Sequence, residues 1–377
     1  MRVLIAPDKF KGALNAREVA ENIAKGLRDA IPNARIEILP MADGGEGTAE
    51  AICEARGGSW LICKAHDPIG REIDARYGWI ENGKLAVMEM SETAGMRRLL
   101  ENERDPVRAT TFGVGEMILD AANRGANQIT IGLGGSATND GGFGMANALG
   151  FRFSTQTQPL KFDGLKPSSF PSAVSELVEL MRINEPKDLK LPKIIAAVDV
   201  RNPLLGENGA TRVFGPQKGA TADKIAILER SLGRLADVVA DEFGFDYRDQ
   251  LGAGAAGGLG FGLMSFCGAT IRPGFDVVAE AVGLELKMKN VDIVITGEGS
   301  LDRQTLEGKT PAGVARMARK LGKKVFAMVG RASGNGDVRG IFDGVYQNTR
   351  AGMSEKENME RAAELLRENA RELAKEL

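Results

Sequence analysis

The sequence of 377 residues is poor in the side chains that most often carry redox and metal chemistry. It contains one histidine, His66, so a mechanism that needs paired imidazoles is excluded, and His66 is expected to be a neutral surface residue. The three cysteines, Cys53, Cys63 and Cys267, form no short-spaced pair of the zinc-binding or redox kind. Carboxylates and lysines must therefore carry out any acid–base chemistry.

The chain also lacks a charge excess and a long apolar run. A net charge of −2 provides no concentrated positive field, which argues against a nucleic-acid or membrane-surface partner. The first residues, Met1–Asp8, turn polar too soon for a signal peptide, and no apolar run has the length of a membrane span. These absences predict a cytoplasmic protein, and the chain length favours two domains over one.

Glycine is the residue that the sequence has in excess, at 48 of its 377 positions. Seven glycines lie between Gly132 and Gly150, and another seven lie between Gly252 and Gly268. Glycine-dense loops allow backbone N–H groups to approach a ligand closely. The two segments are therefore candidate binding loops.

Both ends of the chain follow a pattern of alternating strands and helices. Arg2–Ala6 and Arg35–Pro40 are predicted strands, and Asn15 begins the helix between them with a capping-box pattern. The predicted elements near the other end are strands Val291–Thr296, Lys324–Gly330 and Gly344–Asn348, a helix capped by Thr310, and an amphipathic helix from Glu355 to the end. Strand–helix–strand units imply a parallel sheet with ligand loops at its carboxyl edge.

The middle of the chain has a different pattern. Its predicted strands are Trp60–Ala65, Ala75–Glu81, Lys84–Met90, Gln128–Leu133 and Lys193–Val198, and Phe151–Pro192 is interpreted as connection and surface helix. We therefore predict an α/β protein with a discontinuous parallel-sheet domain, residues 1–64 and 285–377. A second α/β domain with a mixed sheet, residues 65–284, is inserted into it.

Polar loops follow the first two strands. Lys9 and Lys11 lie beside a helix N-terminus, where positive charge and free backbone amides favour an anion, although a solvated loop would look the same. Asp43 and Glu46 form an acidic pair in a glycine loop, which suits Mg²⁺ binding or a general base. The alternative for Asp43 is helix capping.

Two glycine loops occupy the middle of the chain. Gly132–Gly142 ends a strand and opens a helix, so its amides can hold phosphate, with Asn139 and Asp140 placed as cation ligands or caps. Gly252–Gly260 contains the spacing of a dinucleotide fingerprint, but no apolar strand precedes it, and we reject that interpretation. A close contact between packed elements is the alternative for this second loop.

A last polar loop, Thr296–Thr305, follows the strand near residue 291. Glu298 and Asp302 are candidates for a cation ligand or a base. The segment Gly308-Lys309-Thr310 imitates the end of a Walker A motif, but the glycine required five positions earlier is Arg303. The sequence therefore contains no P-loop there.

In order, these loops resemble the motif set of the bacterial glycerate kinases that have a flavodoxin-like domain and an inserted domain similar to a restriction-enzyme fold. The matching segments are Ala6–Gly12, Pro40–Thr48, Thr111–Glu116, Gly134–Gly142, Asp199–Leu204, Phe214–Ala220, Gly252–Gly260 and Ile295–Gly299. The resemblance covers nearly the whole chain. It implies transfer of phosphate from ATP, with Mg²⁺, to glycerate, giving 2-phosphoglycerate.

On this basis we assign hypothetical roles. Asp43 would accept the proton of the substrate hydroxyl, Lys11 would steady the transferring phosphoryl group, and Asp8 would orient Lys11 or bind the metal. The proposed nucleotide and phosphate contacts are Gly134, Gly135, Ser136, Asn139, Asp140, Gly254, Gly257 and Gly258, and the proposed Mg²⁺ ligands are Asp199 and Glu298.

The sequence departs from the family pattern at Lys9, where members also carry serine, and at Arg201, where the family often has aspartate. Lys9 is therefore given no catalytic role. Three alternatives stay open: a kinase for hydroxypyruvate or tartronate, a nicotinamide-dependent dehydrogenase, and a ligand-binding protein without activity. The oligomeric state also stays open, with a homo-oligomer as one alternative.

Overall fold

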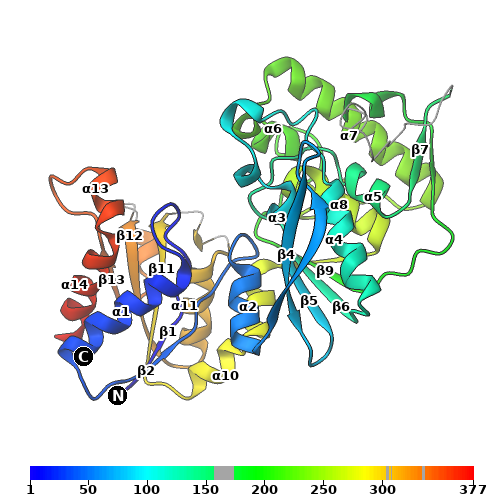
Figure 1. The fold of residues 1–377 in the computed structure, drawn as a ribbon. Helices are drawn as coiled ribbons and strands as arrows, with labels where there is room; N and C mark the ends of the chain where they lie inside the picture. The colour runs from blue at the N-terminus through cyan, green and yellow to red at the C-terminus, as the bar shows by residue number, and fades with distance from the viewer. Residues whose placement is uncertain (157–173, 303–304, 307, 333–335) are drawn as a thin grey trace. The chain divides into compact units, whose positions relative to one another are not determined.

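The computed structural model describes residues 1–156, 174–302, 305–306, 308–332 and 336–377 (Figure 1). The chain divides into two compact units, Met1–Arg56 with Pro273–Leu377 and, inserted between these, Gly57–Arg272. The sequence placed these two divisions after residues 64 and 284. The α/β class, with one all-parallel sheet and one separate mixed sheet, is confirmed.

The first unit is built on a parallel sheet whose strands come from both ends of the chain. In spatial order its strands are β13 (Gly344–Gln347), β12 (Lys324–Ala332), β11 (Ile293–Leu301), β1 (Arg2–Ile5) and β2 (Arg35–Ile38). When the strands are read from β2 to β13 and numbered along the chain within this unit, their order is 2-1-3-4-5, as in flavodoxin-like folds. The order reverses between β1 and β11, which is where such sheets bind ligands.

Helices cover both faces of this sheet. The helix α1 (Ala16–Ala30) begins with the predicted capping box of Asn15 and Glu18, and it packs with α14 (Ala362–Ala374) on strand residues such as Val3 and Phe326. The remaining helices of the unit are α2 (Thr48–Arg56), α9 (Gly274–Ala281), α10 (Leu284–Lys289), α11 (Thr310–Lys320), α12 (Gly336–Arg339) and α13 (Glu355–Glu360). Because right-handed crossovers leave β1 and β11 in opposite directions, α1 and α11 lie on opposite faces (Figure 1).

The second unit contains a six-stranded mixed sheet. In spatial order its strands are β10 (Thr270–Pro273), β9 (Lys193–Val198), β6 (Gln128–Gly132), β5 (Leu85–Glu89), β4 (Glu72–Ile80) and β3 (Ser59–His66). The strands β5, β6 and β9 pair in parallel, whereas β3 and β4 form an antiparallel hairpin. The helices are α3 (Ser91–Ala94), α4 (Phe112–Asn123), α5 (Phe143–Ala148), α6 (Ala210–Phe214), α7 (Ala222–Phe243) and α8 (Ala255–Cys267).

Three local predictions differ from the structure. Lys309 occupies the N-cap of α11, because Thr310 is already helical. The C-terminal helix is two helices, α13 and α14, which meet at Arg361. Phe151–Pro192 contains a two-stranded sheet of β7 (Arg152–Ser154) and β8 (Arg182–Asn184) and the short 3-10 helix Val174–Glu179, while residues 157–173 lie outside the described residues.

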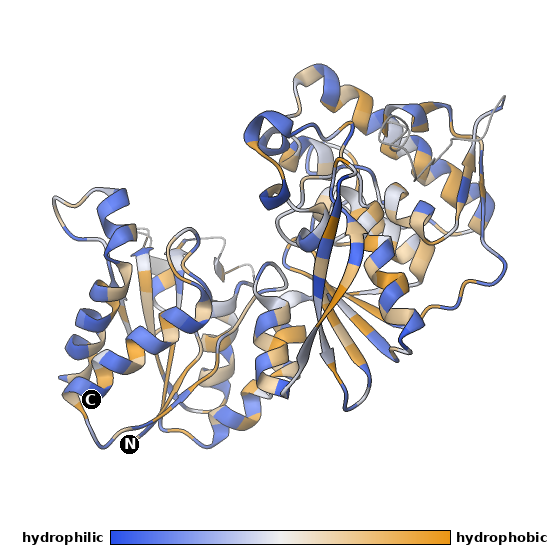
Figure 2. Cartoon of the chain, viewed as in Figure 1, coloured by the Kyte–Doolittle hydropathy of each residue, from blue (hydrophilic) through white to orange (hydrophobic). Residues whose placement is uncertain are grey.

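Each unit has its own hydrophobic core. Figure 2 shows apolar residues along the sheet strands and on one side of the amphipathic helices, with polar residues on the other side. The core of the second unit includes Tyr77, Phe151 and Phe261, all of which are buried. In the part of the chain that the structure describes, no helix combines the length and apolarity needed to cross a membrane.

Candidate active site

A cavity of about 550 Å³ opens at the carboxyl edge of the parallel sheet. Segments that follow or end all five strands contribute its walls, and they include the carboxylates Asp8, Asp43 and Glu298. A fourth lining carboxylate, Glu355, comes from α13. Asp8 follows β1 and Glu298 belongs to β11, so the two acids flank the point where strand order reverses. Backbone pairing continues past β1, since the Asp8 N–H donates to the carbonyl of Gly297 at 2.8 Å.

Asp8 is a buried carboxyl group held by two donors. The Thr310 hydroxyl donates to Oδ2 at 2.8 Å, and the Lys9 backbone N–H donates to Oδ1 at 2.7 Å. Burial, together with the nearby charge of Asp43, raises the pKa of Asp8 to about 7, although Lys9 and both donors oppose the shift. A cation or a proton at this position would relieve the crowding of negative charge.

Glu298 is similar. Its side chain accepts a hydrogen bond from the Thr305 hydroxyl. Burial raises the pKa of Glu298 to about 7, with Thr305 and Lys309 opposing the shift and Asp8 adding to it. Asp8 and Glu298 therefore influence each other across the same cavity.

The Asp43 loop is fixed by its backbone and by a tight contact. Its Oδ1 accepts from the Gly45 N–H at 3.3 Å, the local turn that the capping alternative anticipated. A Cβ at Gly274 would lie 1.7 Å from the Asp43 carbonyl oxygen, so only glycine fits at the start of α9. The close packing of α9 thus positions the loop that carries Asp43.

Four cationic side chains line the same cavity: Lys9, Lys11, Lys309 and Arg331. The Lys9 ammonium donates to the carbonyl of Glu46, which ties the first loop to the second. Sequence analysis gave Lys309 no site role and missed Arg331. Arg331 lies near the end of β12, the parallel neighbour of β11, and that position is the signal that could have found it.

The predicted loop Gly134–Ser136 belongs to the second unit. Gly135 has a φ of +71° and is exposed, and its carbonyl accepts from the Met96 N–H at 2.9 Å. The next residue, Ser136, forms an isolated antiparallel bridge with Gly95. The loop is therefore held against the segment that follows β5.

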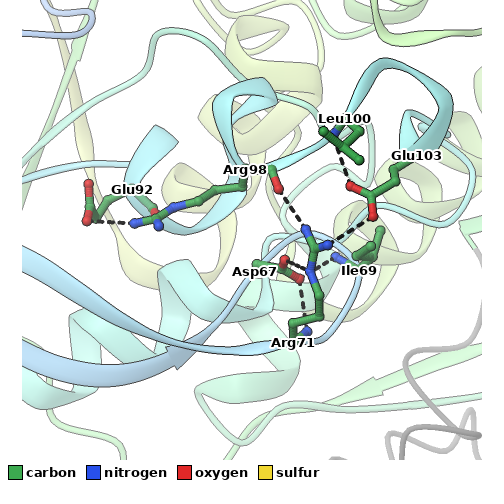
Figure 3. A network of polar contacts seen from close by, with 7 residues as sticks. All are labelled: Asp67, Ile69, Arg71, Glu92, Arg98, Leu100 and Glu103. Atoms are coloured by element: carbon green, nitrogen blue, oxygen red, sulfur yellow. Dashed lines mark hydrogen bonds and ion pairs between the residues drawn. The ribbon is translucent and has the colours of Figure 1, made fainter.

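A network of ion pairs fixes that segment (Figure 3). Arg71 bonds the buried Asp67, contacts Glu103 at 2.9 Å and donates to the Arg98 carbonyl at 2.7 Å. Glu92, also buried, accepts from Arg98 at 2.7 Å. Its contacts join residues within the segment to one another and to Arg71, so the network holds the backbone that supports Gly135.

Asn139 and Asp140 are buried and serve the interior of the second unit. Asp140 accepts from the Thr111 N–H and hydroxyl at 2.8 and 2.9 Å, and from the amides of Gly142 and Gly144, both at 3.1 Å. These four donors occupy the Asp140 carboxylate oxygens, as backbone N–H groups occupy those of a helix-capping aspartate. The Asn139 amide donates to the Thr211 hydroxyl at 2.9 Å.

Lys218 lies beside this loop, and sequence analysis gave it no role. The residue is 2% exposed, and its Nζ donates to the Thr138 carbonyl at 2.7 Å. Burial lowers the pKa of Lys218 to about 7, and the charge of Asp140 opposes the shift. The hydrogen bond from Lys218 therefore holds this loop in place.

Gly254, Gly257 and Gly258 are explained by packing, the alternative considered for their loop. A Cβ at Gly257 would lie 1.9 Å from the Thr138 carbonyl oxygen, and one at Gly254 would lie 2.2 Å from that of Pro203. Gly257 and Gly258 also have φ values of +70° and +87°. Asp199 is exposed after β9, and among the described residues no three acidic, histidine or cysteine side chains gather as for a metal ion.

The predicted residues thus form two groups. Asp8, Lys11, Asp43 and Glu298 line one cavity of the first unit. The glycine loops, Asn139, Asp140 and Asp199 belong to the second unit.

Comparison with known proteins identifies the pattern. Residues 3–377 match the model of the glycerate kinase family. The chain is 40% identical over 380 residues to a glycerate kinase of Halalkalibacterium halodurans, covering 99% of this chain and 97% of that one. It is 41% identical over 331 residues to the glycerate 2-kinase of Escherichia coli (strain K12), covering 88% of this chain and 85% of that one. A solved structure named glycerate kinase 2, from Salmonella typhimurium LT2, superposes with a TM-score of 0.84 at 38% identity, covering 100% of this chain and 98% of that one.

Proposed function

The chain belongs to the glycerate kinase family, and from this premise we propose that it transfers the γ-phosphate of ATP to glycerate, giving 2-phosphoglycerate. The observation that carries the proposal is the cavity at the switch point of the parallel sheet, which gathers four carboxylates and four cations. Phosphoryl transfer needs this mixture, because cations hold phosphate while a carboxylate receives the proton of the acceptor hydroxyl. Phosphorylation at O2 is supported by the name of the Escherichia coli relative.

We assign the proton transfer to Asp43. It is held by the turn at Gly45 and by the packing of α9, so its position is defined before substrate binds. Lys11 lines the same cavity and would neutralise charge on the transferring phosphoryl group. Asp8, fixed by Thr310, would orient Lys11 or bind the metal.

Mg²⁺ fits this cavity, although the described residues hold no cluster of three ligands. Mg²⁺ is commonly held by one or two carboxylates together with substrate phosphates. Asp8 and Glu298 suit that role, because burial has already raised the pKa of both. The ion would neutralise phosphate charge, and Asp199 remains a proposed ligand from the second unit.

Gly134, Gly135 and Ser136 remain our proposal for phosphate contacts from the second unit. Gly135 is exposed and has a positive φ, so its backbone can approach an anion closely. Asn139, Asp140, Gly254, Gly257 and Gly258 would support this path indirectly, through the packing and hydrogen bonds described above.

NMR of the product tests the proposal. The protein is incubated with ATP, Mg²⁺ and each enantiomer of glycerate, and the phosphorus–proton coupling identifies the phosphorylated oxygen. We expect 2-phosphoglycerate from one enantiomer and equal amounts of ADP. Hydroxypyruvate and tartronate serve as competing acceptors, and faster ADP release with either of them would contradict glycerate as the substrate.

A further inference from the structure

Two buried threonines contact the carboxylates that flank the switch point of the parallel sheet. The Thr310 hydroxyl donates to Asp8, and the Thr305 hydroxyl donates to Glu298. Both threonines are fully buried, and neither lines the cavity. A ligand in the cavity therefore reaches the two carboxylates but not the threonines behind them, so these hydroxyls can act on a ligand only through Asp8 and Glu298.

The hydrogen bonds of Thr305 define which oxygen of Glu298 is available. The Thr305 oxygen accepts from the Asp302 N–H at 3.1 Å, and the Thr305 N–H donates to the Asp302 carbonyl at 3.0 Å. Because a hydroxyl has a single proton to donate, that proton is directed to the Glu298 Oε1. In the part of the chain that the structure describes, no group donates to the other oxygen of Glu298. The carboxylate is thus held at one oxygen and left with the other for a cation.

Thr310 holds Asp8 in a comparable way. Its hydroxyl donates to Oδ2 at 2.8 Å, while the Lys9 N–H donates to Oδ1 at 2.7 Å, and each oxygen keeps a second acceptor site. Thr310 is the first residue of α11, which packs closely on α9: a Cβ at Gly313 would lie 2.4 Å from the Phe275 ring. This packing fixes the position of the Thr310 hydroxyl, and hence the orientation of Asp8.

We propose that Thr305 and Thr310 are positioning residues, whose hydroxyls hold Glu298 and Asp8 still so that both carboxylates bind the Mg²⁺ of the nucleotide. The inference rests on the proposed function, in which these two acids suit that ion. A carboxylate that is already fixed loses less side-chain freedom when a cation binds than one that can rotate. Partners that hydrogen-bond metal-binding side chains commonly set the affinity of the site for its ion.

The test measures how much Mg²⁺ strengthens the binding of ADP. Calorimetry gives the Kd of ADP with and without Mg²⁺, and the ratio of the two values reports the coupling between ion and nucleotide without any turnover. Thr305→Val and Thr310→Val keep nearly the same side-chain shape but lack the hydroxyl. In both variants we expect the ratio to fall about 10-fold, with little change in the Kd measured without Mg²⁺.

Two sets of variants separate this role from a structural one. Thr305→Ser and Thr310→Ser keep the hydroxyl and should restore the wild-type ratio. Thr296→Val is the matched control, because the fully buried Thr296 hydroxyl donates at 2.9 Å to the backbone carbonyl of Ala6 instead of to a carboxylate. It should lower the Tm as the other valine variants do, but it should keep the wild-type ratio.

A wild-type ratio in either of the first two valine variants overturns the inference. So does a ratio that serine fails to restore, or one that Thr296→Val lowers equally. If a valine variant fails to fold, alanine at the same position gives the comparison, because it leaves space beside the carboxylate instead of a methyl group. Failure of the proposed function is distinct: no 2-phosphoglycerate would form, while the dependence of ADP binding on Mg²⁺ would still be measured in every variant.

Discussion

At the scale of single residues, the proposed base can be tested by an isosteric change. Asp43→Asn keeps the shape of the side chain but cannot accept a proton, so we expect kcat to fall by about 10²- to 10⁴-fold. ADP binding, measured by calorimetry, should change little. Glu46→Gln removes a carboxylate from the same loop but outside the cavity lining, and it should keep wild-type turnover. Wild-type turnover in Asp43→Asn would show that another group takes the proton.

Lys218 predicts a pH dependence of stability. Burial lowers its pKa from 10.5 to about 7 in the folded protein, so between these pH values the unfolded chain binds more protons. The free energy of unfolding therefore rises with pH in this window. Lys218→Met removes the effect. From pH 7 to pH 9 we expect the wild-type Tm to gain about 4–8 °C relative to this variant.

The control for Lys218 is Lys190→Met, which removes an exposed lysine of the same unit. Melting curves of this variant should run parallel to those of the wild-type protein across the pH range. If Lys218→Met also runs parallel, the buried ammonium keeps its ordinary affinity for protons, and the loop is fastened by packing alone.

At the scale of elements, the loop before α8 depends on close backbone contact. Gly257 and Gly268 both have positive φ, +70° and +60°, but only Gly257 faces a backbone oxygen, at 1.9 Å from an added Cβ. Gly268→Ala should destabilise the protein by about 1 kcal/mol through its backbone alone, and Gly257→Ala by about 3 kcal/mol or more. Denaturant midpoints measure both. Equal losses would mean that φ, rather than the contact, requires glycine.

The elements also show what sequence patterns can determine. The strand Lys193–Val198 and the helix after Asn15 agree with prediction, because a buried apolar run and a capping box are local signals. The sheet of β7 and β8 was missed, since strands of three residues are too short to show alternation. The cap of α11 was misplaced by one residue, because the Thr310 hydroxyl bonds Asp8 instead of its own helix.

The candidate site also contains residues that the sequence could predict and residues whose role it could not. Asp8, Asp43 and Glu298 could be found because polar residues after parallel strands meet at one sheet edge. Asp140 looked like a ligand, but tertiary hydrogen bonds from Thr111 occupy it.

At the scale of the whole molecule, the insertion separates the two halves of one sheet. The strands β1 and β2 precede the second unit and β11 follows it, yet β1 pairs with β11. The cavity therefore depends on residues from both ends of the chain, although it lies within the first unit. The proposed nucleotide contacts can be separated by unit, since the cavity is in the first and the loop Gly134–Ser136 is in the second.

Hydrogen exchange with and without ADP makes that separation. If the nucleotide occupies the cavity of the first unit, ADP should slow exchange in Lys9–Ala13 and Met353–Met359, which line it, because ligand contacts suppress local opening. Protection at Gly134–Ser136 in addition would support the proposed phosphate contacts of that loop. Protection confined to Gly134–Ser136 would place the nucleotide on the second unit, and the cavity of the first unit would then be left for the acceptor acid alone.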